Sequence, residues 1–523
     1  MQGAGERLTR PAREDDPLSG LAMTDRPAAG SLAPPELPIS RPVPSRPVLI
    51  ASNRGPVTFT RQDGQLVSQR GGGGLVTALT GALAGSGALW VASAMSDEDR
   101  EQAGRPRIPF EAGDSTFDLR FLSFDDDTYE RYYNGIANSV LWFVHHYLWD
   151  MVRVPHFDER TRADWDAYRT VNEAFAATLA NEGERLMGSP AYLIQDYHLS
   201  LVPQMLRQRL PGARISHFSH IPFAGPTYIS ILPRWMREEL LSGLLGADVV
   251  GFQADHWADN FLLACRTLPG TRVNLRHRLV LWEGREIRVR VYPVSIDAEA
   301  MESQSRTRAV ARARRQLRRS LGTQRLILRV DRAELSKNIL RGFLAFEELL
   351  ITRPDWRGRA RLLACMDPSR GSIAEYRRYT RQCLLTAERI NRTFATEGWR
   401  PIEVRLEEDH PALLAAFGLY DVLLVNPLFD GMNLVAKEGP VVNRRRGVLV
   451  LSSNAGAHAE LGRYALTVNP FDVSETAEAL VAALEMGGAE RRRRARGLRA
   501  AVLRRRPESW IEEQVMDLDR LGP

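Results

Sequence analysis

The sequence contains little cysteine. Cys265, Cys365 and Cys383 are the three cysteines in 523 residues, and no two of them form a Cys-x-x-Cys pair. This spacing argues against a disulfide framework and against a zinc site built from cysteines. Sparse cysteine is typical of proteins in a reducing compartment, so we expect a cytoplasmic protein.

Long apolar runs are also missing. No window holds the roughly 18 to 20 consecutive apolar residues that would span a bilayer, although 44% of the residues are hydrophobic. Residues 1–7 are polar and do not resemble a secretory signal. We therefore expect a protein that has no membrane partner.

Residues 1–46 lack hydrophobic periodicity. They are rich in proline, alanine, glycine and charge, a composition that predicts a disordered N-terminal extension. Translation can start at Met1 or at Met23, and the sequence does not decide between them.

The net charge is +6, but the positive residues do not form a nucleic-acid module. Arginine is dense in two segments, 312–319 and 491–506, where alanine and leucine recur at helical spacing. Neither segment carries a series of aromatic residues that could stack on bases. We expect solvated helix faces there and no nucleic-acid partner.

From residue 47 onward, short apolar runs alternate with amphipathic helical stretches. A first series of apolar runs covers residues 47–52, 191–195, 214–218, 248–252 and 287–294. A second series covers residues 325–330, 361–365, 422–425 and 448–451. This alternation predicts an α/β protein with two Rossmann-like domains that face each other across a cleft.

We place the boundaries of these domains from the same pattern. The first domain is expected at 47–295 and the second at 296–500, and a C-terminal helix at 501–523 is expected to return to the first domain.

The most informative motif follows the apolar run 422–425. Asp430 and Gly431 come next, and Glu438 stands eight positions after the aspartate. The apolar spacing predicts a helix that begins near Met432. Unpaired amides at a helix start suit a diphosphate, and Glu438, about two turns further on, could reach ribose hydroxyls. The alternative is a strand, a tight turn and a capped helix without a ligand.

Two cations flank the turn after the run 325–330. Arg332 and Lys337 would lie at the carboxyl edge of a sheet, where they could neutralise a leaving diphosphate without a metal. Taken alone, such a pair is also common as surface charge.

A glycine run includes Gly72, Gly73 and Gly74 and precedes a predicted helix. Glycines let backbone amides approach a phosphate or a sugar closely. The run lacks the Gly-Lys-Ser/Thr ending of a nucleotide-hydrolysing loop. A flexible loop without a ligand is the alternative.

Asp196 and His220 each follow a predicted strand. Either could bind a sugar hydroxyl there, although isolated residues of these types are more often structural. The spacing of Asp196 and His198 also allows a metal, but no third ligand is evident in the sequence.

Together these segments resemble the trehalose-6-phosphate synthase family of retaining glycosyltransferases, which have the GT-B fold. The resemblance extends from about residue 47 to the C-terminus. It rests on Ser52-Asn53-Arg54, Gly72-Gly73-Gly74-Leu75, Tyr133-Asn134, Asn138, Leu141-Trp142, Asp196-Tyr197-His198, His220-Ile221-Pro222-Phe223, Arg332, Ser336-Lys337, Ser369-Arg370-Gly371 and 430–438.

The resemblance implies that the first domain binds the acceptor and the second binds the nucleotide sugar. The implied donor ligands are Arg332 and Lys337 for the diphosphate, His220 and Asp430 for the glucose, the amides of Met432, Asn433, Leu434 and Val435 for the phosphates, Glu438 for the ribose, and Gly72, Gly73 and Gly74 in a loop that closes over the donor. The implied acceptor ligands are Arg54, Tyr133 and Arg370 for the phosphate and Trp142 and Asp196 for the sugar.

The chemistry that the resemblance implies is front-face glucosyl transfer with retention, without a metal or another cofactor. A nucleoside diphosphate glucose would be the donor, glucose 6-phosphate the acceptor and α,α-trehalose 6-phosphate the product. The oligomeric state stays open, with a homo-oligomer as one option.

Departures from the family pattern keep alternatives open. The family usually has Thr-Pro-Leu-Arg before Asp-Gly-Met-Asn, whereas this chain has Asn426-Pro427-Leu428-Phe429, so the donor nucleoside can be uridine, guanosine or adenosine. Segment 439–443 resembles pseudo-glycosyltransferases that join aminocyclitols. A synthase that uses glycerol 3-phosphate or a cyclitol phosphate is therefore one alternative. A non-catalytic regulator that binds sugar phosphates is another, and the retained motif residues argue against it.

Overall fold

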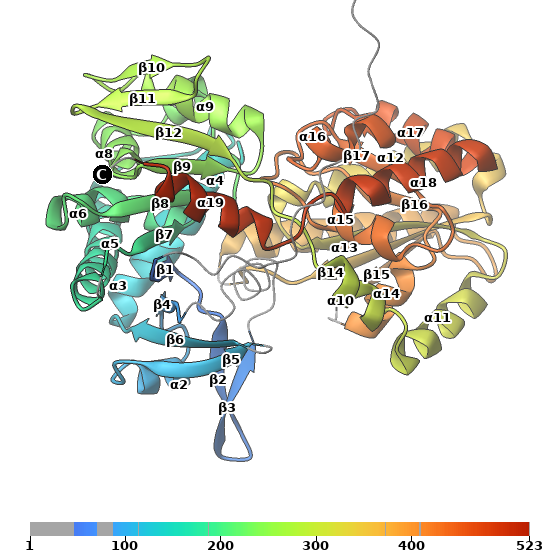
Figure 1. Ribbon diagram of the computed structural model, residues 1–523. Helices are drawn as coiled ribbons and strands as arrows, with labels where there is room; N and C mark the ends of the chain where they lie inside the picture. Colours follow the sequence, from blue (N-terminus) through green and yellow to red (C-terminus); the bar gives the residue numbers. More distant parts are fainter. Residues whose placement is uncertain are drawn as a thin grey trace, which may run out of the picture. The chain divides into compact units, whose positions relative to one another are not determined.

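Two sheets carry the architecture of this protein in the computed structural model (Figure 1). The structure describes residues 46–70, 87–112, 115–186, 188–371, 373–406 and 409–521. These residues fall within one compact unit, Val43–Pro523. The glycine run at 72–74 and nearly all of the expected N-terminal extension lie outside the described residues.

The first sheet has ten strands and is parallel through its centre. Antiparallel pairs at both ends extend it. Its order is β10 (Arg272–Asn274), β11 (Leu279–Trp282), β12 (Arg285–Val291), β9 (Val249–Phe252), β8 (Arg214–Ser219), β7 (Ala191–Gln195), β1 (Val48–Ser52), β4 (Leu89–Ser93), β6 (Ser115–Leu122) and β5 (Ile108–Ala112). A separate hairpin pairs β2 (Val57–Gln62) with β3 (Gln65–Arg70).

The second sheet has six strands, and each pair of neighbours is parallel. Its order is β15 (Ile402–Arg405), β14 (Ala360–Asp367), β13 (Arg325–Arg332), β16 (Val422–Val425), β17 (Val448–Ser452) and β18 (Leu466–Val468). The inner strands are continuous apolar runs because helices cover both faces of a parallel sheet.

The strand order explains where ligands can bind. In the second sheet the strands follow the order 3-2-1-4-5-6 along the chain, and the parallel part of the first sheet repeats this order in β6-β4-β1-β7-β8-β9. This is the Rossmann arrangement, whose ligands bind where the order reverses, outside the carboxyl ends of the strands. The two reversal points lie between β1 and β7 and between β13 and β16. The predicted fold of two Rossmann-like sheets is confirmed.

The helices of the first half connect its strands. They are α2 (Asp97–Gln102), α3 (Asp126–Glu130), the π-helix η1 (Arg131–Leu141), α4 (Trp142–His145), α5 (Glu159–Glu184), η2 (Tyr197–Leu199), α6 (Val202–Arg209), α7 (Pro226–Ile229), α8 (Arg234–Leu245) and α9 (Asp255–Cys265). The long helix α5 begins at a capping box, in which Asp158 accepts from the Thr161 amide and Thr161 accepts from the Asp158 amide.

The helices of the second half likewise connect its strands. They are α10 (Ala298–Gln304), α11 (Arg308–Leu321), η3 (Leu335–Lys337), α12 (Ile339–Thr352), η4 (Pro354–Trp356), α13 (Ala374–Phe394), α14 (His410–Phe417), α15 (Val435–Val442), α16 (His458–Leu461), η5 (Gly462–Tyr464), α17 (Val473–Glu485) and α18 (Gly488–Val502). None of the helices in the described ranges is both long enough and apolar enough to cross a membrane.

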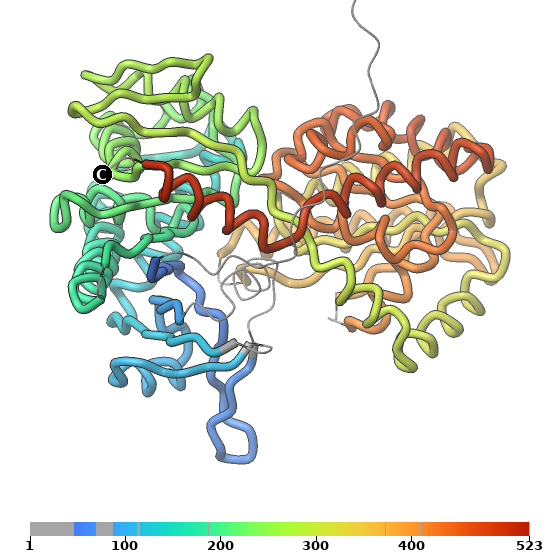
Figure 2. Tube along the Cα trace, viewed as in Figure 1, coloured from blue at the N-terminus to red at the C-terminus, as the bar shows by residue number. Residues whose placement is uncertain are grey.

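The last helix, α19 (Ser509–Asp519), packs against β8 and β9 of the first sheet. Figure 2 shows this dark red segment beside the green strands, after the chain has left the second half. Trp510 is fully buried there. Ser216 donates to Gln514 at 3.2 Å, and the Tyr292 hydroxyl donates to Asp517 at 2.6 Å. The C-terminal helix α19 therefore packs on the first half of the protein.

One of the arginine-rich segments differs from the expectation of solvated faces. Arg491, in α18, is buried. Its guanidinium donates to the carbonyl oxygens of Met486, Asp421 and Ala483 at 3.1, 3.1 and 2.6 Å. The prediction was wrong at this position because an arginine can replace solvent with several carbonyl oxygens at once.

Candidate active site at the reversal points

A cavity of about 760 Å³ lies at the two reversal points and is lined from both halves. From the first half come residues after β1, β7 and β8 and residues of η1 and α4, and from the second half come residues at or after the ends of β13, β14 and β16. The predicted residues that line it are Arg54, Tyr133, Trp142, Asp196, His220, Arg332, Lys337, Arg370 and Asp430. The structure thus brings together side chains that are up to 376 positions apart (430 − 54).

Lys337 and Asp430 form the central ion pair of this cavity. The Lys337 Nζ lies 2.5 Å from Asp430 Oδ2, and both side chains are largely buried. Burial opposes the charge of Lys337, but the carboxylates of Asp430 and Glu334 outweigh it and raise its pKa. Burial likewise opposes the charge of Asp430, yet Lys337 lowers the pKa of that carboxyl. Both groups are therefore charged at neutral pH.

The loop after Asp430 differs in detail from the expectation. The helix α15 begins at Val435 and not near Met432. Asn433 has a positive φ of 78°, and its side chain donates to Asp430 Oδ2 at 3.1 Å and accepts from the Ala436 amide at 3.2 Å. This asparagine takes the left-handed conformation and caps the first turn, which delays the start of the helix.

Gly431 lies where no side chain fits. A Cβ atom on this residue would be 1.9 Å from the carbonyl oxygen of His220. The Trp257 indole of the first half donates to the Gly431 carbonyl at 3.2 Å. The glycine is needed for this close approach of two backbones, which holds Asp430 beside His220.

Five other predicted donor residues follow Gly431, which lines the cavity, but do not line it themselves. Met432 and Asn433 are buried, Leu434, Val435 and Glu438 are half-buried, and none of the five is among the residues that line the cavity. Burial raises the pKa of Glu438 to about 7. Gly72, Gly73 and Gly74 fall outside the described residues.

Glu334 is a buried hub that the sequence analysis missed. Its Oε1 accepts from the Ser369 hydroxyl at 3.0 Å and lies 3.0 Å from both Arg332 and Arg370. Burial opposes its charge, but Arg332 and Arg370 lower the pKa of this carboxyl. Glu334 therefore links Arg332, which is expected at the donor, to Arg370, which is expected at the acceptor. Its position two residues after Arg332, at the end of β13, is the signal in the sequence that could have identified it.

Arg370 is held from several sides. Its φ is positive at 47°, and its guanidinium carbon lies 3.8 Å from the centre of a Trp142 ring. The Nε donates to Asn138 at 3.0 Å, and further N–H groups donate to the hydroxyls of Tyr376 and Tyr197 at 3.3 and 3.4 Å. Most of its donors are therefore already engaged, and the residue spans both halves.

The π-helix η1 supplies two parts of the first wall. It carries Tyr133 and Asn134, which line the cavity, and π-helical turns are frequent at functional sites. The Tyr133 ring stacks between Tyr129 and His198, with centroid distances of 5.5 and 5.7 Å. Arg54 follows β1 and is exposed at the same wall.

Asp196 and His220 face each other at the ends of β7 and β8. The His220 amide donates to Asp196 Oδ1 at 3.1 Å. Burial raises the pKa of Asp196 to about 6 and lowers the pKa of His220 to about 3. His220 is therefore a neutral imidazole at pH 7, with its Nε2 placed 3.1 Å from Gln195 Oε1.

Several buried polar atoms around the cavity have no hydrogen-bond partner among the described residues. They include Trp142 Nε1, Gln195 Nε2 and His198 Nε2. Leaving such groups unsatisfied costs about 1 to 3 kcal/mol each. Their position points to a polar ligand with many hydroxyl or phosphate oxygens.

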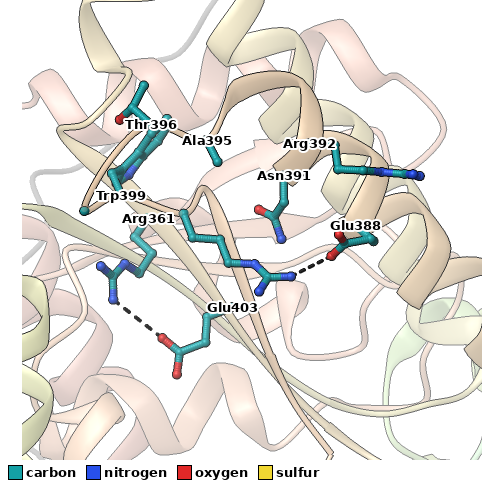
Figure 3. A pocket seen from close by; sticks show the side chains of 10 residues that line it. Arg361, Glu388, Asn391, Arg392, Ala395, Thr396, Trp399 and Glu403 are labelled. Atoms are coloured by element: carbon teal, nitrogen blue, oxygen red, sulfur yellow. Dashed lines mark hydrogen bonds and ion pairs between the residues drawn. The ribbon is translucent and has the colours of Figure 1, made fainter.

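A second cavity, of about 610 Å³, lies between α13 and β15 (Figure 3). Two ion pairs cross it, and a third arginine of its lining, Arg392, is exposed. Arg400 lies 2.6 Å from Glu388, and Arg361 lies 3.6 Å from Glu403. None of the predicted site residues lines it. In the described ranges, no group of three histidine, cysteine, aspartate or glutamate residues could hold a metal ion.

The sequence is similar to those of known proteins over most of its length. The sequence is 36% identical over 488 residues to a trehalose-6-phosphate synthase from Mycobacterium avium (strain 104), which covers 91% of this chain and 96% of the relative. It is 34% identical over 483 residues to a bifunctional trehalose-6-phosphate synthase/phosphatase from Thermoproteus tenax, covering 90% of this chain and 63% of that protein.

Solved structures show the same fold. One is an E. coli protein bound with UDP-2-fluoro glucose, with a TM-score of 0.79 and 31% identity, covering 91% of this chain and all of that chain. Another is a UDP-forming α,α-trehalose-phosphate synthase from Burkholderia xenovorans in complex with glucose-6-phosphate, with a TM-score of 0.76, 29% identity and the same coverage. The sequence model of glycosyltransferase family 20 matches residues 46–520. Because this match spans nearly the whole chain, the protein belongs to glycosyltransferase family 20.

Proposed function

We propose that this protein transfers glucose from a nucleoside diphosphate glucose to glucose 6-phosphate and forms α,α-trehalose 6-phosphate with retention. The observation that carries the proposal is the single cavity in which Arg332, Lys337 and Arg54 converge with unsatisfied buried donors. Cations suit the two phosphate-bearing substrates, and the free donors suit sugar hydroxyls. The names of the curated relatives support the same reaction.

The donor would lie against the second half. Arg332 ends β13 and Lys337 follows in η3. Both face the diphosphate, with the amides of residues 432–435 near its phosphates and Glu438 at the ribose. Asp430 uses Oδ2 for both Lys337 and Asn433, so Oδ1 is left for a glucose hydroxyl. His220 binds the same glucose as a neutral imidazole, and Gly72, Gly73 and Gly74, which lie outside the described residues, are proposed to bind the donor.

The acceptor would lie against the first half. Arg54, Tyr133 and Arg370 bind its phosphate, and Trp142 and Asp196 bind its sugar. Trp142 Nε1 is buried without a partner among the described residues and can donate to a hydroxyl.

In the transfer, the bond between the anomeric carbon and the diphosphate oxygen breaks, and a bond to the acceptor oxygen forms on the same face. The proton of the acceptor hydroxyl passes to the departing phosphate, which leaves as the nucleoside diphosphate. Arg332 and Lys337 stabilise the charge that develops on that phosphate. We propose that no metal takes part, and we place the protein in the cytoplasm because its cysteines are sparse.

One experiment tests both substrates. Purified protein is assayed with UDP-, GDP- and ADP-glucose, each paired with glucose 6-phosphate, glycerol 3-phosphate, a cyclitol phosphate or glucose, and the anomeric configuration of the product is read by NMR. Retained product with glucose 6-phosphate, unchanged by a chelator, is expected. Faster turnover with another acceptor, equal turnover of glucose and glucose 6-phosphate, or loss of activity with the chelator would contradict the proposal.

A further inference from the structure

The imidazole ring of His220 is held by two aromatic side chains and by two glutamines. Its centre lies 4.7 Å from that of the Phe218 ring and 5.3 Å from that of the Trp510 ring of α19. Its Nδ1 lies 3.5 Å from Gln253 Nε2, and its Nε2 lies 3.1 Å from Gln195 Oε1. Gln253 follows β9, and Gln195 ends β7. Each ring nitrogen of His220 therefore has one glutamine as its partner.

A backbone group fixes the orientation of the Gln253 amide. Gln253 is buried, and the Val294 amide donates to its Oε1 at 2.9 Å. An N–H group can only donate, so the oxygen of the Gln253 amide has to lie on that side. The Val294 carbonyl accepts from Lys437 Nζ of α15 at 2.7 Å, which anchors the same segment to the second half. The nitrogen of the Gln253 amide is thereby turned toward His220.

The directions of the next hydrogen bonds follow from this orientation. Gln253 Nε2 can only donate, so His220 Nδ1 has to accept. A neutral imidazole carries one hydrogen, which must then be on Nε2. From Nε2 it is donated to Gln195 Oε1. The opposite tautomer would set the N–H of His220 against the amide N–H of Gln253, and neither would have an acceptor there.

This line of hydrogen bonds ends at the reaction cavity. Gln195 lines the cavity, and its Nε2 is buried without a hydrogen-bond partner among the described residues. Because Oε1 accepts from His220, the group that is left over is a donor and not an acceptor. Buried polar groups normally have a partner, so an oxygen atom of a ligand is the expected acceptor.

We infer that Gln253 is a positioning residue that fixes the hydrogen of His220 on Nε2, and that the Gln195 amide donates to an oxygen of the donor glucose. The identity of this sugar rests on the proposed function, whereas the tautomer of His220 does not. The contact between Gln253 and His220 is the longest of the line, at 3.5 Å. The experiment therefore measures the tautomer directly.

Nitrogen-15 NMR of the full chain, labelled in its histidines, measures the tautomer, because ring nitrogens with and without a hydrogen differ widely in chemical shift. The signals of His220 are assigned by their loss in His220→Gln. We expect the hydrogen on Nε2 in the parent protein. Gln253→Glu keeps an acceptor for the Val294 amide but as a carboxylate, at about pH 8, offers no N–H, so the hydrogen should move to Nδ1. A hydrogen on Nδ1 in the parent, or an unchanged tautomer in Gln253→Glu, would overturn the positioning role.

Titration calorimetry with UDP-glucose and with UDP tests the role of Gln195. Gln195→Met keeps the length of the side chain but loses the amide. The affinity for UDP-glucose should fall about threefold to tenfold, the value of one neutral hydrogen bond, while the affinity for UDP stays constant. The tautomer of His220 should also stay as it is, because Gln253 is retained. An equal loss of affinity for both ligands, or no loss, would overturn the binding role.

The matched control is Gln316→Glu, which makes the same chemical change as Gln253→Glu at an exposed position of α11. It should change neither the tautomer of His220 nor the affinity for UDP-glucose. The NMR measurement needs no substrate. If the parent protein bound no UDP-glucose, that result would contradict the proposed function, and the tautomer of His220 would still decide the role of Gln253.

Discussion

The two halves of this protein share one strand order but equip the common cavity in different ways. The first half presents mostly neutral groups to the cavity, such as the Tyr133 ring of η1, the Trp142 ring of α4 and the His220 imidazole after β8. The ends of β13 and β16 present charge, in the form of Lys337 and Asp430. The same scaffold therefore yields two kinds of wall, because the residues after each strand, and not the strands, set the chemistry.

The charges of the second half also depend on one another. Lys337 pairs with Asp430, and Glu334 pairs with both Arg332 and Arg370. The first half has looser contacts, with several donors left unpaired. A substitution in the second half should therefore weaken several parts of the site, whereas a substitution in the first half should affect only its immediate surroundings. The following predictions test this difference.

The largest effect is expected from Lys337→Ala. Loss of a charged group that stabilises the leaving diphosphate costs on the order of 2 to 4 kcal/mol in the transition state. The turnover number should therefore fall about a hundredfold or more. Steady-state kinetics with both substrates saturating measure it, and Arg392→Ala serves as the distant control. Normal turnover would show that this cation is not part of the site.

Glu334→Gln should have the next largest effect, because it leaves Arg370 buried without its counter-ion. We expect a loss of about 3 kcal/mol in unfolding free energy and a kcat/KM roughly fiftyfold lower for both substrates. Glu334→Asp should restore part of the activity, since it keeps the charge. If only one KM changed, the carboxylate would not link the two subsites.

In the first half, Trp142 allows a matched pair of changes. Trp142→Ala removes the ring over Arg370 and the unpaired Nε1, so the KM for the acceptor should rise about twentyfold. Trp142→Phe keeps a ring and should raise it only about fivefold. The KM for the donor should stay constant in both variants. A parallel change in the donor KM would contradict the local character of this wall.

The smallest effect concerns pH. Burial raises the pKa of Asp196 to about 6 from 3.8, so the folded protein holds a proton there between about pH 4 and pH 6 that the unfolded chain has released. This group's contribution to stability should decline as pH rises through that window. If the carboxylate form binds the acceptor, kcat/KM should fall about tenfold between pH 7 and pH 5. Asp196→Asn should flatten that part of the profile, and an unchanged profile would exclude Asp196 as its origin.

The sequence predicts the fold well because apolar runs mark the inner strands directly. It also brings Arg332, Lys337 and Asp430 to one place, since the carboxyl ends of parallel strands share an edge. It does not reveal the Glu334 hub, which depends on Arg370 approaching from 36 positions away. It places the start of α15 too early, because hydrophobic spacing carries no information on the left-handed Asn433.

The close contact at Gly431 has a mechanical consequence. Here the His220 carbonyl, Gly431 and Gly456 are stacked so tightly that a Cβ on either glycine would lie 1.9 Å from the next carbonyl oxygen. The two halves therefore meet at His220 and Gly431 with no room for a side chain, whereas Arg54, at the same cavity, is exposed. Any residue larger than glycine at position 431 or 456 would push these backbones apart and disturb the alignment of Asp430 with His220.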